Sequence, residues 1–146
     1  GDVYKRQVDA ALDLIDKNSL AYEAVEVAKK FVNQSASNLH DHYGDMSPVH
    51  SLNNLAVVIW AFLSFQDSFD EAIGETICCG WDTDCTGATV GGLIGLDKGS
   101  IPESWTDPWQ GRVNTAIAGV GELKLEDLVE RTCKLVDQFS SESDMD

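Results

Sequence analysis

The stretch CCGWDTDCTGATVGGLIG, residues 78–95, combines regularly spaced glycines with two closely spaced carboxylates. Gly87, Gly91 and Gly95 recur at every fourth position, so they would line one face of a helix predicted over 86–96. Each interior glycine costs about 1 kcal/mol of helix stability relative to alanine. The row therefore indicates either that another backbone packs very close to this face or that the face is left bare at a site.

The segments before this stretch have the patterns of helices. Ser68 and Glu71 form an S-x-x-E capping box, and the helix that they begin is predicted to end at Gly80, which suits a left-handed C-terminal position. Ahead of it, 51–65 is apolar on nearly every side, which is typical of a central buried helix. Nearer the N-terminus the sequence predicts three further segments: helices over 8–16 and 20–33, the second capped by Ser19, and a polar loop over 34–48.

The segments after this stretch are a mixture of turns and one long helix. In chain order we expect a turn anchored by two tryptophans over 101–109, a short extended piece over 112–117, an amphipathic helix over 125–139, and a solvated acidic tail over 140–146. No segment alternates convincingly between apolar and polar residues, as a half-buried strand would. The sequence therefore predicts an all-α fold.

The first residues suggest a cloning or sequencing scar. DVYKRQ, residues 2–7, matches the in-frame translation of a transposon-end adaptor used in sequencing libraries. A real chain terminus of the same composition is the alternative. We expect residues 1–7 to be an artefact and leave them out of the fold prediction. On this interpretation the chain is the C-terminal part of a longer protein.

Composition and charge narrow the classes of protein. The 146 residues include 43% hydrophobic residues, ordinary for one globular domain, and no apolar run approaches the roughly 20 residues that span a bilayer. A net charge of −15 opposes direct binding to nucleic acid or anionic lipid, so an anionic ligand would need a cation. The spacing of the four cysteines fits neither a disulfide framework nor a zinc site. We therefore expect a soluble cytoplasmic protein with reduced thiols, with no membrane and no nucleic acid among its partners.

Asp82 and Asp84 are the main candidates for a functional site. Alternate residues lie on the same side of an extended segment but not of a helix, so their convergence requires GWDTD to be extended or turned. Two carboxylates held close together repel, and each would have its pKa raised unless a cation neutralised them. Carboxylates with a neighbouring hydroxyl suit Mg²⁺, Mn²⁺ or Ca²⁺. The sequence therefore indicates a site for a hard cation.

The pair of aspartates also fits three other patterns in part. In the simplest, Asp84 is the N-cap of a helix that begins at Thr86, and Asp82 faces water. DTDCTG also opens like a calcium-binding EF-hand loop, but Leu93 stands where that loop needs its bidentate glutamate. The pattern D-x-D-x-T occurs in phosphatases of the haloacid dehalogenase type, where it ends a buried strand, whereas helical patterns follow here.

GWDTDCTGATVGGLIG, preceded by two helices and followed by IPESW, resembles the C-terminal half of the ADP-ribosylglycohydrolase family over about Val49 to Trp105. The resemblance implies an orthogonal multi-helix bundle, present as a C-terminal fragment over residues 8–139. It implies a hydrolase with two Mg²⁺ ions, Mn²⁺ being possible. Its substrates would be ADP-ribosylated proteins or small ADP-ribose derivatives, cleaved at the anomeric carbon of the ribose.

The resemblance also implies a set of site residues. By motif position Asp82 and Asp84 would be metal ligands, whereas Cys85 stands where the family has a threonine or serine ligand, and a thiol is a poor partner for a hard cation. Thr86 or water would then be the substitute. The backbone N–H groups at the start of the helix, with Gly87 as the substrate-binding candidate, would face an anion. The family's other ligands, a T-D-D cluster, have no match here, so the chain would carry about half of the binuclear site and would be inactive alone.

The remaining polar and aromatic candidates have simpler explanations. His50 is expected at the beginning of the helix over 51–65, and a polar loop accounts for His40 and His42 as well as a transition-metal site would. For Trp81 and Trp105 the alternatives are a wall of an adenine or ribose pocket and core packing, of which core packing is preferred. For Arg112 a surface ion pair is preferred to a phosphate contact.

Two functions from different classes therefore stand at the level of sequence. The preferred one is the hydrolase. The alternative is a non-catalytic, all-helical module that binds ADP-ribose or a partner protein. Cys85 favours the alternative, whereas the intact pair of aspartates opposes it.

Overall fold

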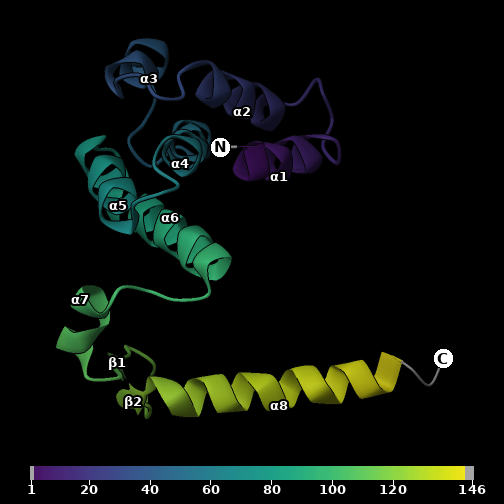
Figure 1. The fold of residues 1–146 in the computed structure, drawn as a ribbon, viewed down its shortest axis with the longest axis vertical. Helices are drawn as coiled ribbons and strands as arrows, with labels where there is room; N and C mark the ends of the chain where they lie inside the picture. Colours follow the sequence, from purple (N-terminus) through teal and green to yellow (C-terminus); the bar gives the residue numbers. More distant parts are fainter. Residues whose placement is uncertain (1, 144–146) are drawn as a thin grey trace. The chain divides into compact units, whose positions relative to one another are not determined.

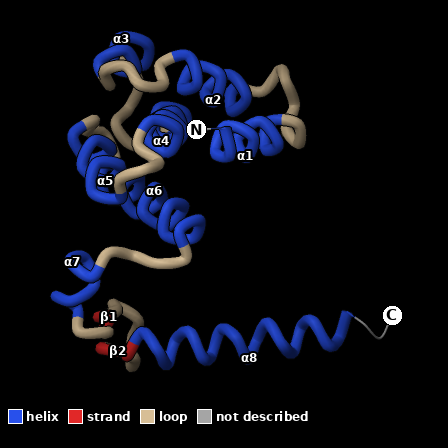
Figure 2. The backbone as a smooth tube through the Cα atoms, in the orientation of Figure 1, coloured by secondary structure: helices blue, strands red, loops and turns tan. Residues whose placement is uncertain are grey.

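The structure, a computed structural model, describes residues 2–143 and divides into two compact units, 1–100 and 101–146. It is all-α apart from one two-stranded sheet, as the sequence predicts (Figures 1 and 2). The first unit contains six helices: α1 (Asp2–Leu12), α2 (Leu20–Lys30), α3 (Ser37–Tyr43), α4 (Ser51–Ser64), α5 (Phe69–Cys78) and α6 (Thr83–Lys98). In the part of the chain that the structure describes, no helix is long and apolar enough to cross a membrane.

Helix α4 forms the centre of the first unit and packs against the other five helices (Figure 1). Of its residues, nine are buried, which confirms the central buried helix predicted over 51–65. Trp60 is only 1% exposed, and its indole N–H lies 3.1 Å from the carbonyl oxygen of Phe31 and 3.2 Å from that of Gln34. The core therefore also fixes the end of α2.

Helix α1 begins earlier than predicted. The expected helix over 8–16 lies instead at Asp2–Leu12, because Tyr4 extends the buried stripe of Val8 and Leu12 by one turn toward the N-terminus. Tyr4 packs edge-on against Phe62 and donates a hydrogen bond of 2.5 Å to Asp97. The prediction failed because it left out the adaptor-like residues, which the structure includes in this helix.

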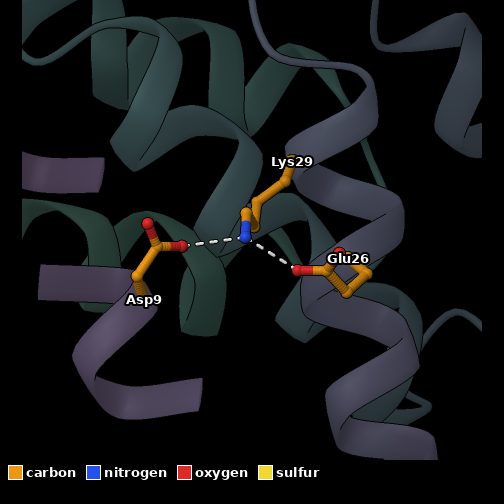
Figure 3. Close-up of polar contacts among 3 residues, drawn as sticks. All are labelled: Asp9, Glu26 and Lys29. Atoms are coloured by element: carbon orange, nitrogen blue, oxygen red, sulfur yellow. Dashed lines mark hydrogen bonds and ion pairs between the residues drawn. The ribbon is translucent and has the colours of Figure 1, made fainter. Parts of the chain in front are cut away.

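An ion-pair cluster links α1 and α2. The Lys29 ammonium lies 2.8 Å from carboxylate oxygens of both Asp9 and Glu26 (Figure 3). The hydrogen bond from Lys29 is the largest cause that lowers the pKa of Asp9.

Helix α2 begins as predicted but ends early. Ser19 caps it by accepting a hydrogen bond of 3.1 Å from the Tyr22 N–H. The helix ends at Lys30, before the predicted residue 33.

The segment predicted as a loop over 34–48 contains helix α3. Leu39 and Tyr43 lie one helical turn apart and are both buried. Two apolar residues in a polar segment were too weak a pattern to predict a helix, which forms because the core covers this side. The prediction of a loop without helix was therefore wrong.

Helices α5 and α6 join at the stretch that holds the two aspartates. Ser68 accepts a hydrogen bond of 3.2 Å from the Glu71 N–H, which confirms this cap of α5, and Gly80 follows the end of the helix with φ +79°. Helix α6 begins at Thr83, three residues before the predicted Thr86.

The glycine row of α6 packs against side chains of α5. A Cβ on Gly91 would lie 3.2 Å from Cδ1 of Ile73, and one on Gly87 would lie 3.4 Å from Cγ1 of Ile77. Close packing therefore explains these two glycines, although their neighbours are isoleucine side chains and not the backbone that we expected.

The second unit contains α7 (Glu103–Thr106), a 3₁₀ turn η1 (Asp107–Trp109), strands β1 (Arg112–Asn114) and β2 (Glu122–Lys124), and α8 (Leu125–Ser143). The strands are antiparallel, with Val113 opposite Leu123, and β1 covers part of the predicted extended piece. Arg112 forms an ion pair with Glu122, as predicted. Helix α8 includes the predicted 125–139 and continues through the first residues of the acidic tail, of which 144–146 lie outside the described residues.

Candidate metal centre

Asp82, Asp84 and Cys85 converge at the beginning of α6. One carboxylate oxygen of each aspartate and the Cys85 sulfur all lie within 4.8 Å of one another. Among the described residues this is the only group of three or more His, Cys, Asp or Glu side chains with such a geometry. Asp82 is half-buried, whereas Asp84 and Cys85 are exposed, so solvent reaches the group.

The local backbone explains this convergence. Asp82 is the N-cap, with φ −87° and ψ 70°, and Asp84 lies in the first turn of α6. We expected the whole of GWDTD to be extended or turned, which is wrong for Asp84. Side chains in a first turn lean toward the N-terminus of the helix, so they approach the side chain of the N-cap residue. The pair therefore meets across a helix beginning.

The N-cap of α6 is Asp82 and not Asp84. The alternative in which Asp84 caps a helix that begins at Thr86 is therefore wrong about the capping residue and about the first residue of the helix. The Asp82 side chain accepts no capping hydrogen bond from the helix. Instead the Cys85 thiol bonds to Asp82, and this hydrogen bond is the largest cause that raises the pKa of Cys85. The sulfur is also a soft donor, which is a poor partner for a hard cation.

Thr86 and Gly87 lie on the inner side of α6. Thr86 is 2% exposed, and its hydroxyl donates a hydrogen bond of 2.9 Å to the carbonyl oxygen of Asp82. Gly87 is buried, and its bare Cα faces Ile77 of α5. The Thr86 hydroxyl therefore already bonds to the backbone that carries Asp82.

The turn before Asp82 is held from two sides. Gly80 and Trp81 both have positive φ, at +79° and +62°. On one side, Oδ1 of Asn54 in α4 accepts a hydrogen bond of 3.2 Å from the Asp82 N–H. On the other, Nε2 of His40 in α3 lies 2.5 Å from the carbonyl oxygen of Cys79. Sequence reasoning missed Asn54, whose only signal was a polar residue within an apolar helix.

The other sequence candidates have structural roles. The Trp81 ring packs against the core and lies 4.1 Å from the His40 ring, which supports its predicted packing role. His50 is the N-cap of α4, and its Nδ1 accepts a hydrogen bond of 3.2 Å from the Leu52 N–H, as expected of a residue at a helix beginning. His42 is exposed, and Trp105 is half-buried within the second unit.

A large hollow of the first unit lies elsewhere. It measures about 570 Å³ and is bordered by apolar side chains of α1, α2, α4 and α6. Neither Asp82 nor Asp84 lines it. The hollow is therefore separate from the candidate metal centre.

Comparison with known protein families gives one match. The family model described as ADP-ribosylglycohydrolase matches residues 2–143, which extends well beyond the motif region 49–105. The comparisons with curated proteins and with solved structures gave no match. The family is generally metal-dependent and acts on ADP-ribosylated substrates. Because the match covers nearly the whole sequence, this chain belongs to the ADP-ribosylglycohydrolase family.

Proposed function

We propose that this protein is a hydrolase that cleaves the glycosidic bond of ADP-ribosylated proteins or small ADP-ribose derivatives. In this proposal Asp82 and Asp84 bind a divalent cation, Mg²⁺ or alternatively Mn²⁺. The observation that carries it is the convergence of the two carboxylates within 4.8 Å at the beginning of α6, in a chain of this family.

The donor chemistry fits a hard cation. Each aspartate offers a carboxylate oxygen, and the Asp82 side chain is not engaged in capping its helix. The Cys85 sulfur is a soft donor and its thiol bonds to Asp82, so we assign the binding to the two carboxylates and to water. Thr86 supports the arrangement through its bond to the Asp82 carbonyl, and we assign it no ligand role.

The residues of the chain have defined tasks in this proposal. The bound cation would supply positive charge and Lewis acidity at the ribose. Asp82 and Asp84 fix its position, and the exposed surroundings of Asp84 leave room for a substrate. In this proposal the first N–H groups of α6 would face an anionic group of the substrate at the positive end of the helix. Gly87, the substrate contact expected from the sequence, is buried against Ile77 and lies past these groups. The protein has a net charge of −15, which repels a diphosphate. The bound cation and the N-terminus of α6 would together provide a local positive potential that attracts it.

Two carboxylates make an incomplete binuclear site. The described residues contain no second cluster of this kind, so in our proposal the remaining ligands come from outside Asp82–Thr86. We therefore expect the 146-residue chain to bind a divalent cation weakly and to release no ADP-ribose from modified proteins even with excess Mg²⁺. Robust turnover by this chain would contradict the half-site proposal.

A non-catalytic module that binds ADP-ribose is the second candidate. Cys85 favours it, because a soft thiol stands where the family motif has a threonine or serine. The substitution Cys85→Thr separates the two candidates in a protein that carries the complete site. A hydrolase should keep or increase its Mg²⁺-dependent rate when the soft sulfur is replaced by a hard oxygen. A binding module should remain inactive.

Calorimetric titration of the 146-residue chain with ADP-ribose tests the function without requiring turnover. We expect Mg²⁺ to strengthen binding of ADP-ribose, and Asp84→Asn to remove this effect while the circular dichroism stays unchanged. Asp13→Asn, which removes one charge from an exposed position far along the sequence, is the matched control. Binding that is equal with and without Mg²⁺, or equal in Asp84→Asn, would contradict the proposal.

A further inference from the structure

The turn between α5 and α6 has a backbone that needs external support. Its two central residues, Gly80 and Trp81, have φ of +79° and +62°. Glycine adopts this conformation freely, but a residue with a Cβ, such as tryptophan, does so only when its surroundings hold it there. Asp82 follows directly, so any change in this turn moves the N-cap residue of α6.

Asn54 holds the end of this turn. Its side chain is 9% exposed, and its Oδ1 accepts a hydrogen bond of 3.2 Å from the Asp82 N–H. Its Nδ2 donates hydrogen bonds of 2.8 Å to the carbonyl oxygens of Pro48 and His50. These two donations fix the orientation of the amide, so the oxygen and not the nitrogen faces Asp82.

His40 holds the beginning of the turn. Its Nε2 lies 2.5 Å from the carbonyl oxygen of Cys79, which can only accept, so Nε2 carries the proton. The same imidazole lies against the Trp81 ring, with the centroids 4.1 Å apart and the planes inclined by 36°. One side chain therefore supports both the carbonyl before Gly80 and the strained residue after it.

We propose that Asn54 and His40 are positioning residues for the cation site, an inference that rests on the proposed function. They fix the two ends of the turn Cys79–Asp82, so that Asp82 sits at the N-cap with its carboxylate free of capping and beside that of Asp84. Neither side chain is a ligand in this proposal. Their contribution is to preset the distance between the two carboxylates before the cation arrives.

The test is a titration of the folded 146-residue chain with Mn²⁺, followed by electron paramagnetic resonance of the free ion. Asn54→Ala should weaken Mn²⁺ binding by about tenfold or more, as loss of an outer-shell partner typically does. Asn53→Ala is the matched control, because Asn53 is 0% exposed and donates its amide to the carbonyl of Ser47, not to the turn. Its Oδ1 accepts only a long hydrogen bond of 3.5 Å from Nδ2 of Asn54, and Asn54 keeps its two donations of 2.8 Å without it. This control should retain the parent affinity.

A pair of His40 variants separates positioning from mere stability. His40→Phe keeps an aromatic ring against Trp81 but cannot donate to Cys79, and it should weaken Mn²⁺ binding by severalfold. His40→Gln restores an N–H donor near the position of Nε2 and should recover most of the affinity. Circular dichroism and urea unfolding of each variant show that it is folded. If Asn54→Ala does not fold, the His40 pair alone decides the matter.

Asp84→Asn distinguishes failure of this inference from failure of the proposed function. If Asp84→Asn binds Mn²⁺ as tightly as the parent, the carboxylates are not the site and both proposals fall. If Asp84→Asn loses binding while folded Asn54→Ala and His40→Phe retain it, the proposed function stands and the positioning role is overturned. Equal weakening in Asn53→Ala and Asn54→Ala would also overturn it, because general loosening of α4 would then be the cause.

Discussion

Both units of the chain contain helices with apolar stripes, but these stripes are buried only in the first unit. In residues 1–100, α4 buries nine of its residues among five other helices. In residues 101–140, no residue is buried, and the apolar side chains of α8 include Val136 at 58% and Phe139 at 66% exposed. An apolar stripe thus predicts a helix in both units, but only packing from several sides creates a core. The candidate site lies on the unit whose core can support a strained turn.

The largest difference in stability is expected between two tryptophan substitutions, one in each unit. Trp60→Ala removes a ring that is 1% exposed and leaves two carbonyl groups without their indole donor. We expect a loss of about 3–5 kcal/mol in the free energy of unfolding. Trp109→Ala, at a side chain that is 50% exposed, should cost less than about 0.5 kcal/mol. Urea unfolding followed by circular dichroism measures both, and similar losses would contradict the comparison.

The next effect concerns adjacent glycines within α6. Gly91→Leu would force a side chain against Ile73, whose Cδ1 lies 3.2 Å from the position of a Cβ, and should cost about 1–3 kcal/mol. Gly92 has no atom within 4 Å of such a Cβ, so Gly92→Leu should be neutral or stabilise the helix by up to about 1 kcal/mol. Thermal melts compare the two variants. An unchanged melting temperature for Gly91→Leu would show that this face is open.

A smaller effect should appear at alkaline pH through Tyr4. Burial is the largest cause that raises the pKa of Tyr4 to about 12, and the hydrogen bond to Asp97 adds to it. Because the folded pKa lies above the unfolded value near 10, this contribution is complete below about pH 10 and disappears as the pH rises toward 12. Tyr4→Phe should therefore lose less stability than the parent between pH 9 and 11. Urea midpoints across this range check the prediction, and parallel curves would refute it.

Much of the first unit could be predicted because the signals are local. The capping pair Ser68 and Glu71, the glycine after α5 and the apolar run of α4 each encode structure within a few residues. Helix α3 could not be predicted, because only Leu39 and Tyr43 turn toward the core and the rest of the segment is polar. Its stability depends on distant neighbours that the local pattern does not contain.

The candidate site likewise has one part that the sequence predicts and one part that it does not. Asp82 and Asp84 were identifiable from their spacing and from the motif around them, although their backbone conformation was not. The hydrogen bonds from His40 to Cys79 and from Asp82 to Asn54 join residues 39 and 28 positions apart, and no periodicity relates them. Contacts of this kind depend on how α3, α4 and α6 pack, which only the three-dimensional structure provides.

Amide nuclear magnetic resonance of the 146-residue chain during a Mg²⁺ titration tests the central claim most directly, namely that the two carboxylates at the beginning of α6 form a cation site. With a net charge of −15, some weak binding is expected anywhere on the surface, so location is the decisive readout. We predict saturable shifts concentrated at residues 81–86, lost in Asp84→Asn and retained in the control Asp13→Asn. Shifts that are scattered over the acidic surface and equal in all three proteins would contradict the account.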